Sequence, residues 1–217
     1  HQAVLRQLID KSREYGLPST VVLFEPLPRE FLAPDAAPPR LMSFREKFEG
    51  IRDLGIDRVV RIRFNNALRN MSADEFITSL FVKNLGAKYI VVGDDLRFGR
   101  DRSGDFDLLR KYGARDGFDV MDTATLLHEG ERVSSTRIRE VLGQGDFALA
   151  EHLLGRPYSI AGRVIVGQQL GRTIGAPTAN IQLRRLRSPL SGVFAVQVAG
   201  VSDSLLPAVA NVGGRPT

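Results

Sequence analysis

The heptapeptide V-S-S-T-R-I-R combines hydroxyl groups, arginines and the start of a helix. Ser134, Ser135 and Thr136 directly precede an apolar-periodic run, and this pattern predicts that a helix begins here. Free N–H groups at a helix N-terminus, with hydroxyls and the guanidinium groups of Arg137 and Arg139, suit a phosphate group. The alternative is an ordinary helix cap with two surface arginines, and the heptapeptide alone leaves both interpretations open.

A second group of residues, G-D-D-L-R-F-G, follows a predicted buried strand. Gly93 and Gly99 permit close approach of the backbone to a ligand. The acidic pair that includes Asp95 could accept hydrogen bonds from hydroxyl or ring N–H groups of a ligand, or help to hold Mg²⁺. The alternative is a solvated turn in which Phe98 packs into the core.

A third group, F-E-P-L-P, ends another apolar strand. Phe24 could face an aromatic ligand, although a core role explains it equally well. The chain has neither G-x-G-x-x-G after a strand nor a Walker A lysine motif, so both common nucleotide fingerprints are missing.

The last third of the chain carries glycines at four-residue spacing, Gly167, Gly171 and Gly175, followed by P-T-A-N. Backbone N–H groups of a glycine-rich loop can surround phosphates. Thr178 and Asn180 would point the same way on a strand, and their side-chain oxygens are hard ligands that suit Mg²⁺. A glycine-rich hairpin with a polar face is the alternative.

The three histidines give weaker signals. His1 could donate an N–H to a phosphate, or it could be simply a terminal residue. His128 and His152 are predicted to be structural or exposed, because neither has a metal-ligand spacing with other histidines. The chain has no cysteine, which excludes disulfides and thiolate metal sites.

The elements that must position these residues alternate between strand and helix in the first two thirds of the chain. We expect strands at 20–24, 58–64, 89–92 and 118–123, and helices around 4–15, 44–54, 72–85, 105–112 and 146–154, with one more helix that begins at the S-S-T stretch. This alternation predicts a doubly wound parallel sheet. Ligands of such sheets lie beyond the carboxyl ends of the strands, where the loops 25–29 and 93–99 and the loop that reaches Ser134 are expected.

After residue 156 the helical period disappears. Short strands are expected at 158–166, 178–181, 192–198 and 206–212, and Gly-, Pro- and Ser-rich turns separate them, which predicts an antiparallel sheet or small barrel. We therefore expect two domains, 1–156 and 157–217. Residues 1–156 hold equal numbers of basic and acidic residues, whereas 157–217 hold six basic residues and one acid, which suggests an anionic ligand there.

Composition narrows the function classes further. No apolar run of 18 residues exists, so no membrane span is expected, and no basic run is interleaved with aromatic residues, so nucleic acid is not the expected partner. The chain begins with histidine inside a helical pattern and ends after a strand-like run. We expect a fragment that is truncated at both ends.

Taken together, the motifs resemble those of the bifunctional bacterial riboflavin kinase/FMN adenylyltransferase family, also called FAD synthetase. G-D-D-x-R-F-G, V-S-S-T-R-I-R, G-R-x-x-G-x-P-T-A-N, G-V-F-A-V and A-N-V-G-x-R-P-T occur in the expected order from end to end. The resemblance implies a nucleotidyltransferase domain of the H-x-G-H class, without its first strand, followed by a β-barrel flavokinase domain without its last part.

The resemblance also implies roles for individual residues. His1 would be the second histidine of H-x-G-H and would act with Arg139 at the ATP phosphates, as parts of the catalytic machinery. Ser134, Ser135, Thr136 and Arg137 would bind nucleotide phosphate, as would Gly167, Gly171 and Gly175 in the kinase half. Phe24, Pro26, Asp95 and Phe98 would bind the flavin, and Thr178 and Asn180 would bind Mg²⁺.

The implied enzyme phosphorylates riboflavin to FMN and adenylylates FMN to FAD. Its substrates would be ATP, riboflavin and FMN with Mg²⁺, and it would be a cytoplasmic monomer or weak oligomer with no nucleic-acid or membrane partner. The kinase glutamate is expected beyond the R-P-T stretch, so kinase activity is expected to be absent from these 217 residues. Alternatives are a nucleotidyltransferase with another phosphorylated acceptor, against which the P-T-A-N stretch argues, and a non-catalytic nucleic-acid-binding protein.

Overall fold

The computed structural model describes residues 2–93, 95–123, 126–166 and 178–213. The chain forms two compact units: residues 1–37 and 47–126 make the first, and residues 38–46 and 127–217 make the second. The second unit therefore takes a short segment from the first third of the sequence. Each unit is described separately below.

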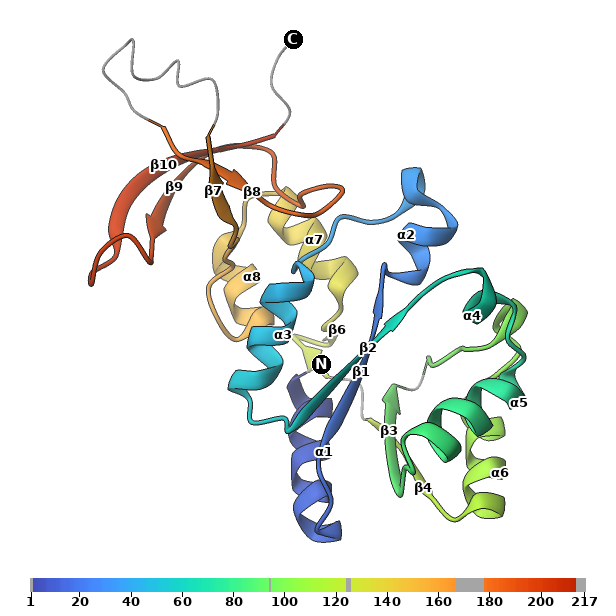
Figure 1. The fold of residues 1–217 in the computed structure, drawn as a ribbon. Helices are drawn as coiled ribbons and strands as arrows, with labels where there is room; N and C mark the ends of the chain where they lie inside the picture. Colours follow the sequence, from blue (N-terminus) through green and yellow to red (C-terminus); the bar gives the residue numbers. More distant parts are fainter. Residues whose placement is uncertain (1, 94, 124–125, 167–177, 214–217) are drawn as a thin grey trace. The chain divides into compact units, whose positions relative to one another are not determined.

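The first unit contains two pairs of parallel strands (Figure 1). They are β1 (Thr20–Glu25) with β2 (Arg58–Arg63), and β3 (Tyr89–Gly93) with β4 (Asp119–Thr123). In the described residues the two pairs are separate two-stranded sheets. The predicted strands and their parallel direction are confirmed, but a continuous doubly wound sheet is not formed, because no backbone hydrogen bonds join β1 to β3.

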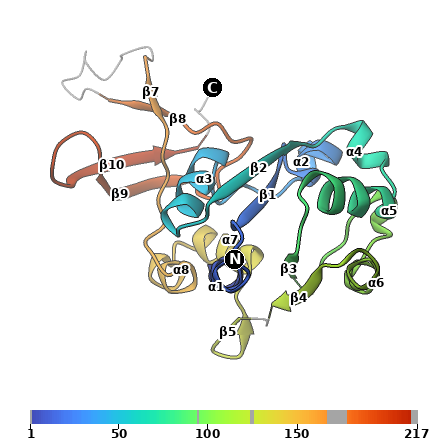
Figure 2. The same ribbon diagram turned by 60° about the horizontal axis from the view of Figure 1, so that its bottom comes forward.

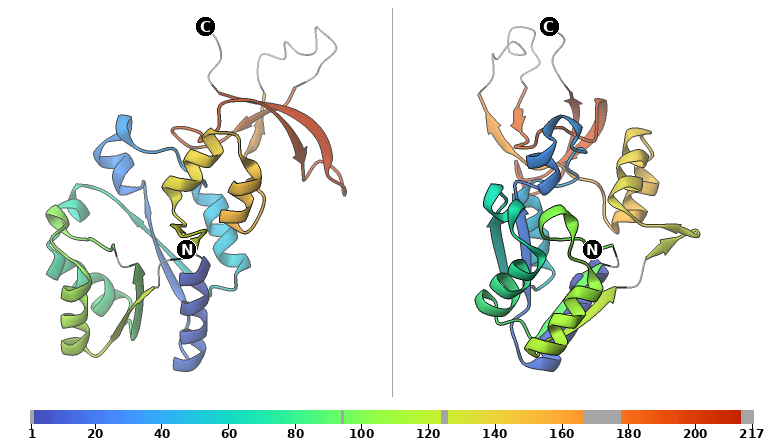
Figure 3. Two further views of the ribbon diagram at one scale, coloured as in Figure 1. Left: turned by 180° about the vertical axis from the view of Figure 1, so that it is seen from behind. Right: turned by 90° about the vertical axis from the view of Figure 1, so that its right-hand side faces the viewer.

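Helices precede and follow these strands. They are α1 (Gln2–Tyr15), α2 (Pro28–Leu32), η1 (Pro34–Ala36), α4 (Asn66–Asn70), α5 (Ala73–Phe76), η2 (Ile77–Asn84), η3 (Arg100–Arg102) and α6 (Phe106–Asp116). The helix α3 (Phe44–Asp53) crosses the point where the chain passes from the second unit to the first. Contacts join α1 to β3 and α6 to β4, and Figures 2 and 3 show α6 alongside β4.

Local signals set the helix ends as expected. Gly16, at φ +62°, follows α1, as a residue in the left-handed region commonly does. Ser72 and Glu75 form a capping box: the Ser72 hydroxyl accepts from Glu75 N at 3.2 Å, and Ser72 N donates to Glu75 Oε2 at 3.0 Å. These bonds draw the pKa of Glu75 below its ordinary value. The helix that starts here continues through π-helical turns to Asn84, close to the predicted end.

The short helix α2 was not predicted, because five prolines between residues 25 and 40 favoured a loop. A signal was present. Pro28 occupies the first helical position, where its missing N–H costs nothing, and Glu30 Oε2 accepts from Leu27 N at 3.3 Å.

The core of the first unit lies between the β3–β4 pair and the helices α5, η2 and α6. Ile77 and Leu109 are completely buried, and Phe76, Phe98 and Tyr112 complete the centre of this cluster. The continuous apolar run of β3 and the amphipathic face of α6 explain why these elements pack together.

Among the described residues, the second unit contains the helices α7 and α8, the start of α3 and three β-hairpins. Its elements are β5 (Leu127–His128), β6 (Glu131–Arg132), α7 (Ser135–Gly143), α8 (Phe147–Leu154), β7 (Arg163–Ile165), β8 (Asn180–Gln182), β9 (Gly192–Val198) and β10 (Leu206–Val212). All strand pairs are antiparallel, and β9 and β10 make the longest hairpin (Figure 2). Leu142 and Ala150, from α7 and α8, share a core with Leu190 and with Phe194 and Val212 of the β9–β10 hairpin.

The expected barrel is not confirmed. Among the described residues, β7–β8 and β9–β10 are separate two-stranded sheets, and a barrel needs strand pairing around a complete ring. The predicted strand at 158–166 is only three residues long. Its first part instead packs on the α7–α8 core, where the Tyr158 hydroxyl donates to Leu41 O at 3.1 Å. The predicted bounds of β9 and β10 are confirmed.

In the described part of the chain, the search for helices that combine sufficient length with apolar character for crossing a membrane found none.

Candidate functional site

A cavity of about 960 Å³ lies in the first unit, and we call it the sheet cavity. Val21 and Val22 of β1 line it together with Val91 and Val92 of β3, so it lies between the two strand pairs. It extends to the carboxyl ends of these strands, where loop residues complete its wall. This is where an α/β sheet places ligands.

Two of the predicted flavin residues meet in this cavity. Phe24 and Phe98 both line it. Phe98 is also 9% exposed and packs on Phe76 with ring centroids 5.3 Å apart, while Phe24 lies 6.2 Å from Phe64 in an edge-to-face arrangement. The core role that the sequence left open for Phe98 is therefore present, and the ring also forms part of the cavity wall.

Gly104 makes the buried position of Phe98 possible. A Cβ atom on Gly104 would lie 2.4 Å from the Phe98 ring, and the backbones of the two residues are bonded in both directions. Any side chain at residue 104 would push the ring out of the cavity wall.

The other two flavin candidates have different positions. Asp95 is exposed, and it is not among the residues that line the sheet cavity. Gly93 approaches it closely, because a Cβ on Gly93 would lie 3.1 Å from Asp95 Oδ1. Pro26 follows β1 directly and is partly buried.

Five arginines at the cavity were missed by the sequence analysis. We call them the arginine rim: Arg29, Arg69, Arg97, Arg100 and Arg102. Each follows the carboxyl end of a strand, and this shared position was a signal that could have identified them.

The helix start at the V-S-S-T-R-I-R heptapeptide is confirmed in the second unit. Ser134 is the N-cap of α7, and its hydroxyl accepts from Arg137 N at 3.2 Å. Ser135 and Thr136 form the first turn, where backbone N–H groups lack partners within the helix. Ser135 is partly buried and Thr136 is exposed.

The two arginines of the motif, Arg137 and Arg139, contact different segments of the second unit. Arg137 holds the β5–β6 hairpin: its Nε lies 2.9 Å from Glu131 Oε2, and its Nη1 donates to His128 O at 3.1 Å. Arg139 instead donates from Nε to Pro39 O at 2.6 Å. Pro39 belongs to the early segment that packs with the second unit, so Arg139 connects α7 to that segment.

His128 is partly buried and His152 is exposed. Their rings lie 4.5 Å apart, and His128 belongs to the hairpin that Arg137 holds. No group of three or more histidine, cysteine or acidic side chains suited to a metal occurs in the portion of the chain that the structure describes.

The predicted metal ligands of the second half lie next to a short strand. Asn180 begins β8 and is partly buried, whereas Thr178 is exposed and precedes the strand. The regular alternation that would place both side chains on one face therefore does not extend to Thr178. His1, Gly167, Gly171 and Gly175 lie outside the described residues.

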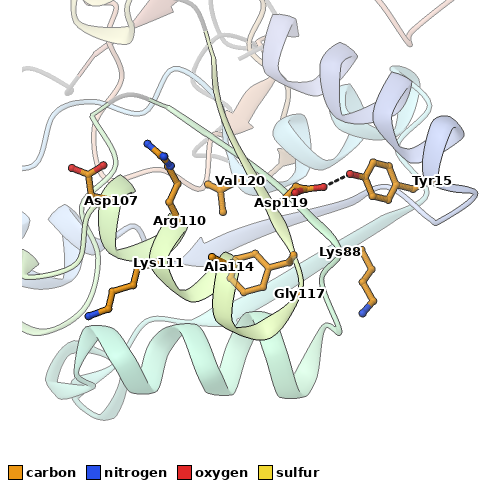
Figure 4. Close-up of a pocket in the computed structure, with 11 residues that line it drawn as sticks. Tyr15, Lys88, Asp107, Arg110, Lys111, Ala114, Gly117, Asp119 and Val120 are labelled. Atoms are coloured by element: carbon orange, nitrogen blue, oxygen red, sulfur yellow. Dashed lines mark hydrogen bonds between the residues drawn. The ribbon is translucent and has the colours of Figure 1, made fainter.

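A second cavity, of about 730 Å³, lies at the amino ends of β3 and β4 (Figure 4). Tyr15 donates a hydrogen bond to Asp119 at its edge, and this bond raises the pKa of Tyr15 to about 12. Figure 4 shows that Lys88, Arg110 and Lys111 point in different directions. Because these cations do not converge, and none of the described candidate residues lines this cavity, we assign no site to it.

Comparison with known proteins agrees with both halves of the chain. Residues 1–137 match the family model described as FAD synthetase, and residues 154–217 match the model described as riboflavin kinase. A crystal structure described as a macrolide-efflux protein from Streptococcus pneumoniae has a TM-score of 0.78 and 29% sequence identity. The match covers 100% of this chain and 70% of that one.

Curated relatives carry the name bifunctional riboflavin kinase/FMN adenylyltransferase. The protein of Escherichia coli K12 is 49% identical over the whole chain, which spans 69% of that relative, and the protein of Pseudomonas fluorescens gives the same values. The protein of Haemophilus influenzae is 45% identical, and the chain spans 70% of it. The chain therefore belongs to the family of bifunctional riboflavin kinases/FMN adenylyltransferases.

Proposed function

We propose that this chain takes part in FAD biosynthesis through two ATP-dependent transfers, the phosphorylation of riboflavin to FMN and the adenylylation of FMN to FAD. One observation supports this proposal: in a single chain, residues 1–137 match the FAD synthetase model and residues 154–217 match the riboflavin kinase model. The predicted division of the two activities, at residues 1–156 and 157–217, remains part of the proposal. A cytoplasmic location is also part of the proposal.

In the adenylyl transfer, a phosphate oxygen of FMN attacks the α-phosphorus of ATP, and the bond to the leaving pyrophosphate breaks. FMN is already a nucleophile at neutral pH, so the step needs no strong base. Its barrier falls when fixed donors stabilise the charge that develops on the phosphoryl oxygens. The first turn of α7, with Ser135 and Thr136, presents such donors, and Arg139 adds a cation.

In the kinase reaction, the 5′-hydroxyl of riboflavin attacks the γ-phosphorus of ATP, the bond to ADP breaks, and the hydroxyl loses its proton. We assign Thr178 and Asn180 to Mg²⁺. Their hydroxyl and amide oxygens suit this ion, which would neutralise phosphate charge when bound. The partly buried Asn180 is the better placed of the two, because β8 fixes its backbone.

We also propose that the sheet cavity accommodates one further parallel strand. Among the described residues, β1 pairs with β2 alone and β3 with β4 alone, and apolar side chains of both inner strands line the space between them. A strand in the order β2–β1–new–β3–β4 would join both pairs into the doubly wound sheet that the alternation of elements predicts.

The function is tested by titrating the protein with riboflavin and with FMN and following flavin fluorescence. Incubation of the full-length protein with ATP then follows, with separation of FMN and FAD. We expect saturable binding of a flavin and ATP-dependent formation of both products. Failure to bind either flavin would contradict the proposal, and transfer of AMP to a different phosphorylated acceptor would replace it.

A further inference from the structure

The segment 38–46 is held by residues from the part of the chain that matches the riboflavin kinase model. The segment itself lies within residues 1–137, which match the FAD synthetase model, whereas Tyr158 and Arg185 lie within 154–217. All of them belong to the second unit, so their contacts lie inside one compact unit. Residues of one family match therefore fix the backbone of the other.

Arg185 is the centre of these contacts. Its Nη1 donates to the carbonyl oxygens of Arg40 at 3.1 Å and Leu41 at 3.3 Å, and its Nη2 lies 2.6 Å from Glu46 Oε2. Only 1% of the Arg185 side chain is exposed. Because a guanidinium group is planar and rigid, one that holds three acceptors at once fixes the course of the segment's backbone.

Further contacts keep the same segment in place. The Tyr158 hydroxyl donates to Leu41 O at 3.1 Å, and Ala161 N donates to Glu46 Oε1 at 2.6 Å. The side chain of Leu41 packs on the core that α7 and α8 form. Hydrogen bonds and apolar packing together therefore fix the backbone at residues 40 and 41.

The preceding residue, Pro39, connects this fixed backbone to Arg139. Pro39 O accepts from Arg139 Nε at 2.6 Å. A bond to Nε sets the direction of the guanidinium group, and Arg139 lies in α7, the helix whose first turn carries the hydroxyl residues of the V-S-S-T-R-I-R motif. A path of contacts thus runs from Arg185 through residues 39–41 to Arg139.

Arg185 could instead support the kinase half alone. It comes shortly after β8, which begins at Asn180, and the Glu46 carboxylate that it contacts also accepts from Ala161 N, just before β7. Such a role would affect FMN formation. The bonds to the two carbonyl groups beside Pro39, however, contribute nothing to the β7–β8 hairpin, and they favour a role toward Arg139.

We propose that Arg185 is a positioning residue for the adenylyl transfer, although it lies in the part of the chain that matches the riboflavin kinase model. The inference rests on the proposed function, because it needs Arg139 at the transferring phosphoryl group. Arg185 fixes residues 40 and 41, and these fix Pro39 O, which directs the guanidinium group of Arg139. A fixed cation stabilises the developing charge without reorganising during the reaction, so loss of its support raises the barrier.

The test measures steady-state kinetics of both reactions in full-length Arg185→Lys: FAD formation from supplied FMN, and FMN formation from riboflavin. Lysine keeps the charge beside Glu46 but cannot hold this carboxylate and two carbonyl groups together. We expect kcat for FAD formation to fall about tenfold to a hundredfold, as a displacement of about 1 Å can cause, with little change in KM for FMN. FMN formation should stay close to that of the wild type.

Two other variants control for general damage. Arg184→Lys makes the same change at the neighbouring, exposed arginine and should leave both reactions unchanged. Tyr158→Phe removes the hydroxyl that donates to Leu41 O but keeps the ring and the Arg185–Glu46 pair, so it should lower FAD formation in the same direction by a smaller factor. Thermal unfolding shows whether each variant is folded, and Tyr158→Phe decides the question if Arg185→Lys is not.

Combination with Arg139→Ala tests the path itself. If Arg185 acts through Arg139, then Arg185→Lys should lower kcat for FAD formation little further in the Arg139→Ala variant, because the group that it positions is already absent. A merely structural role would give the same fold loss in both backgrounds, and the two losses would multiply.

The outcomes distinguish this inference from the proposed function. If Arg185→Lys lowers FAD formation no more than Arg184→Lys does, or lowers FMN formation equally, the inference is overturned while the proposed function stands. Losses that multiply in the double variant also overturn it. If Arg139→Ala leaves FAD formation unchanged, the role of Arg139 fails and the inference fails with it. Absence of ATP-dependent FAD formation in the wild type would contradict the proposed function itself.

Discussion

At the scale of single residues, Arg137 and Arg139 show how two similar side chains in one motif divide into different roles. The side chain of Arg137 is 15% exposed and is engaged with the β5–β6 hairpin through Glu131. Arg139 donates through Nε to Pro39 O, a contact that fixes the direction of its side chain beside the first turns of α7. Arg139 is therefore the stronger candidate for stabilising charge in the adenylyl transfer.

Substitutions of Arg139 and Asn180 should affect the two reactions separately. In the full-length protein, Arg139→Ala should lower FAD formation by on the order of 10²–10³-fold and spare FMN formation, because one fixed donor at the transferring phosphoryl group is lost. Asn180→Ala should do the reverse, abolishing FMN formation while FAD still forms from supplied FMN. Product analysis by chromatography measures both reactions.

Thermal unfolding of each variant serves as the control, since Arg139 also binds Pro39. Equal loss of both activities in a folded Arg139→Ala variant would contradict the assignment of Arg139 to the adenylyl transfer alone.

At the scale of elements, the space between β1 and β3 leaves room for a strand that could pair with both of them. Each of these strands has one neighbour in the described residues, and apolar side chains line the space between them. Unpaired strand edges leave backbone N–H and C=O groups without partners in a sheet. An added strand would satisfy both edges at once.

The inner edges of β1 and β3 can be tested by amide hydrogen exchange. In the full-length protein, amide hydrogens of β1 and β3 should exchange with solvent more slowly than in the 217-residue chain, because an inserted strand would bond to both inner edges. Amide hydrogen exchange followed by mass spectrometry measures the difference.

The outer strands β2 and β4 provide the internal reference, since their inner-edge bonds exist in both cases. Identical protection of β1 and β3 in the two proteins would argue against the added strand.

At the scale of the whole molecule, the segment 38–46 belongs to the second unit although it lies in the first third of the sequence. Arg185 holds it: Nη2 lies 2.6 Å from Glu46 Oε2, and Nη1 donates to Arg40 O at 3.1 Å and Leu41 O at 3.3 Å. The Arg185 side chain is 1% exposed and that of Glu46 is 10% exposed. Burial also raises the pKa of Tyr158, whose hydroxyl accepts from Arg185 Nη1.

Substitutions can test what the buried pair of Arg185 and Glu46 contributes to stability. Arg185→Met leaves the Glu46 carboxylate buried without its cation and should lower the free energy of unfolding by about 3–5 kcal/mol. The double variant Arg185→Met/Glu46→Leu removes both charges and should recover most of this loss. Denaturant unfolding measures both, and the surface variant Arg52→Gln is the control.

If the double variant is as unstable as Arg185→Met, the loss comes from packing or from the carbonyl contacts of Arg185. A buried, unpaired carboxylate would then not be its cause.

The sequence by itself determined the elements and the family. Period-2 and period-3.6 patterns, capping residues such as Ser72, Ser134 and Asp146, and glycines after helices depend on neighbours within a few positions, so they can be recognised without the fold. The order of short motifs was sufficient for the family resemblance, which the comparisons confirmed.

Only the tertiary structure decided which of these residues meet. It gave Phe98 a place in the core as well as in the cavity wall, and it tied Arg137 to a hairpin. It also brought the segment 38–46 to Arg185 and gathered arginines from three separate segments on one cavity. Contacts between residues far apart in sequence depend on how helices and strands pack, and no local pattern encodes that packing. For this reason the sequence could predict the family but not the gathering of five arginines on one cavity.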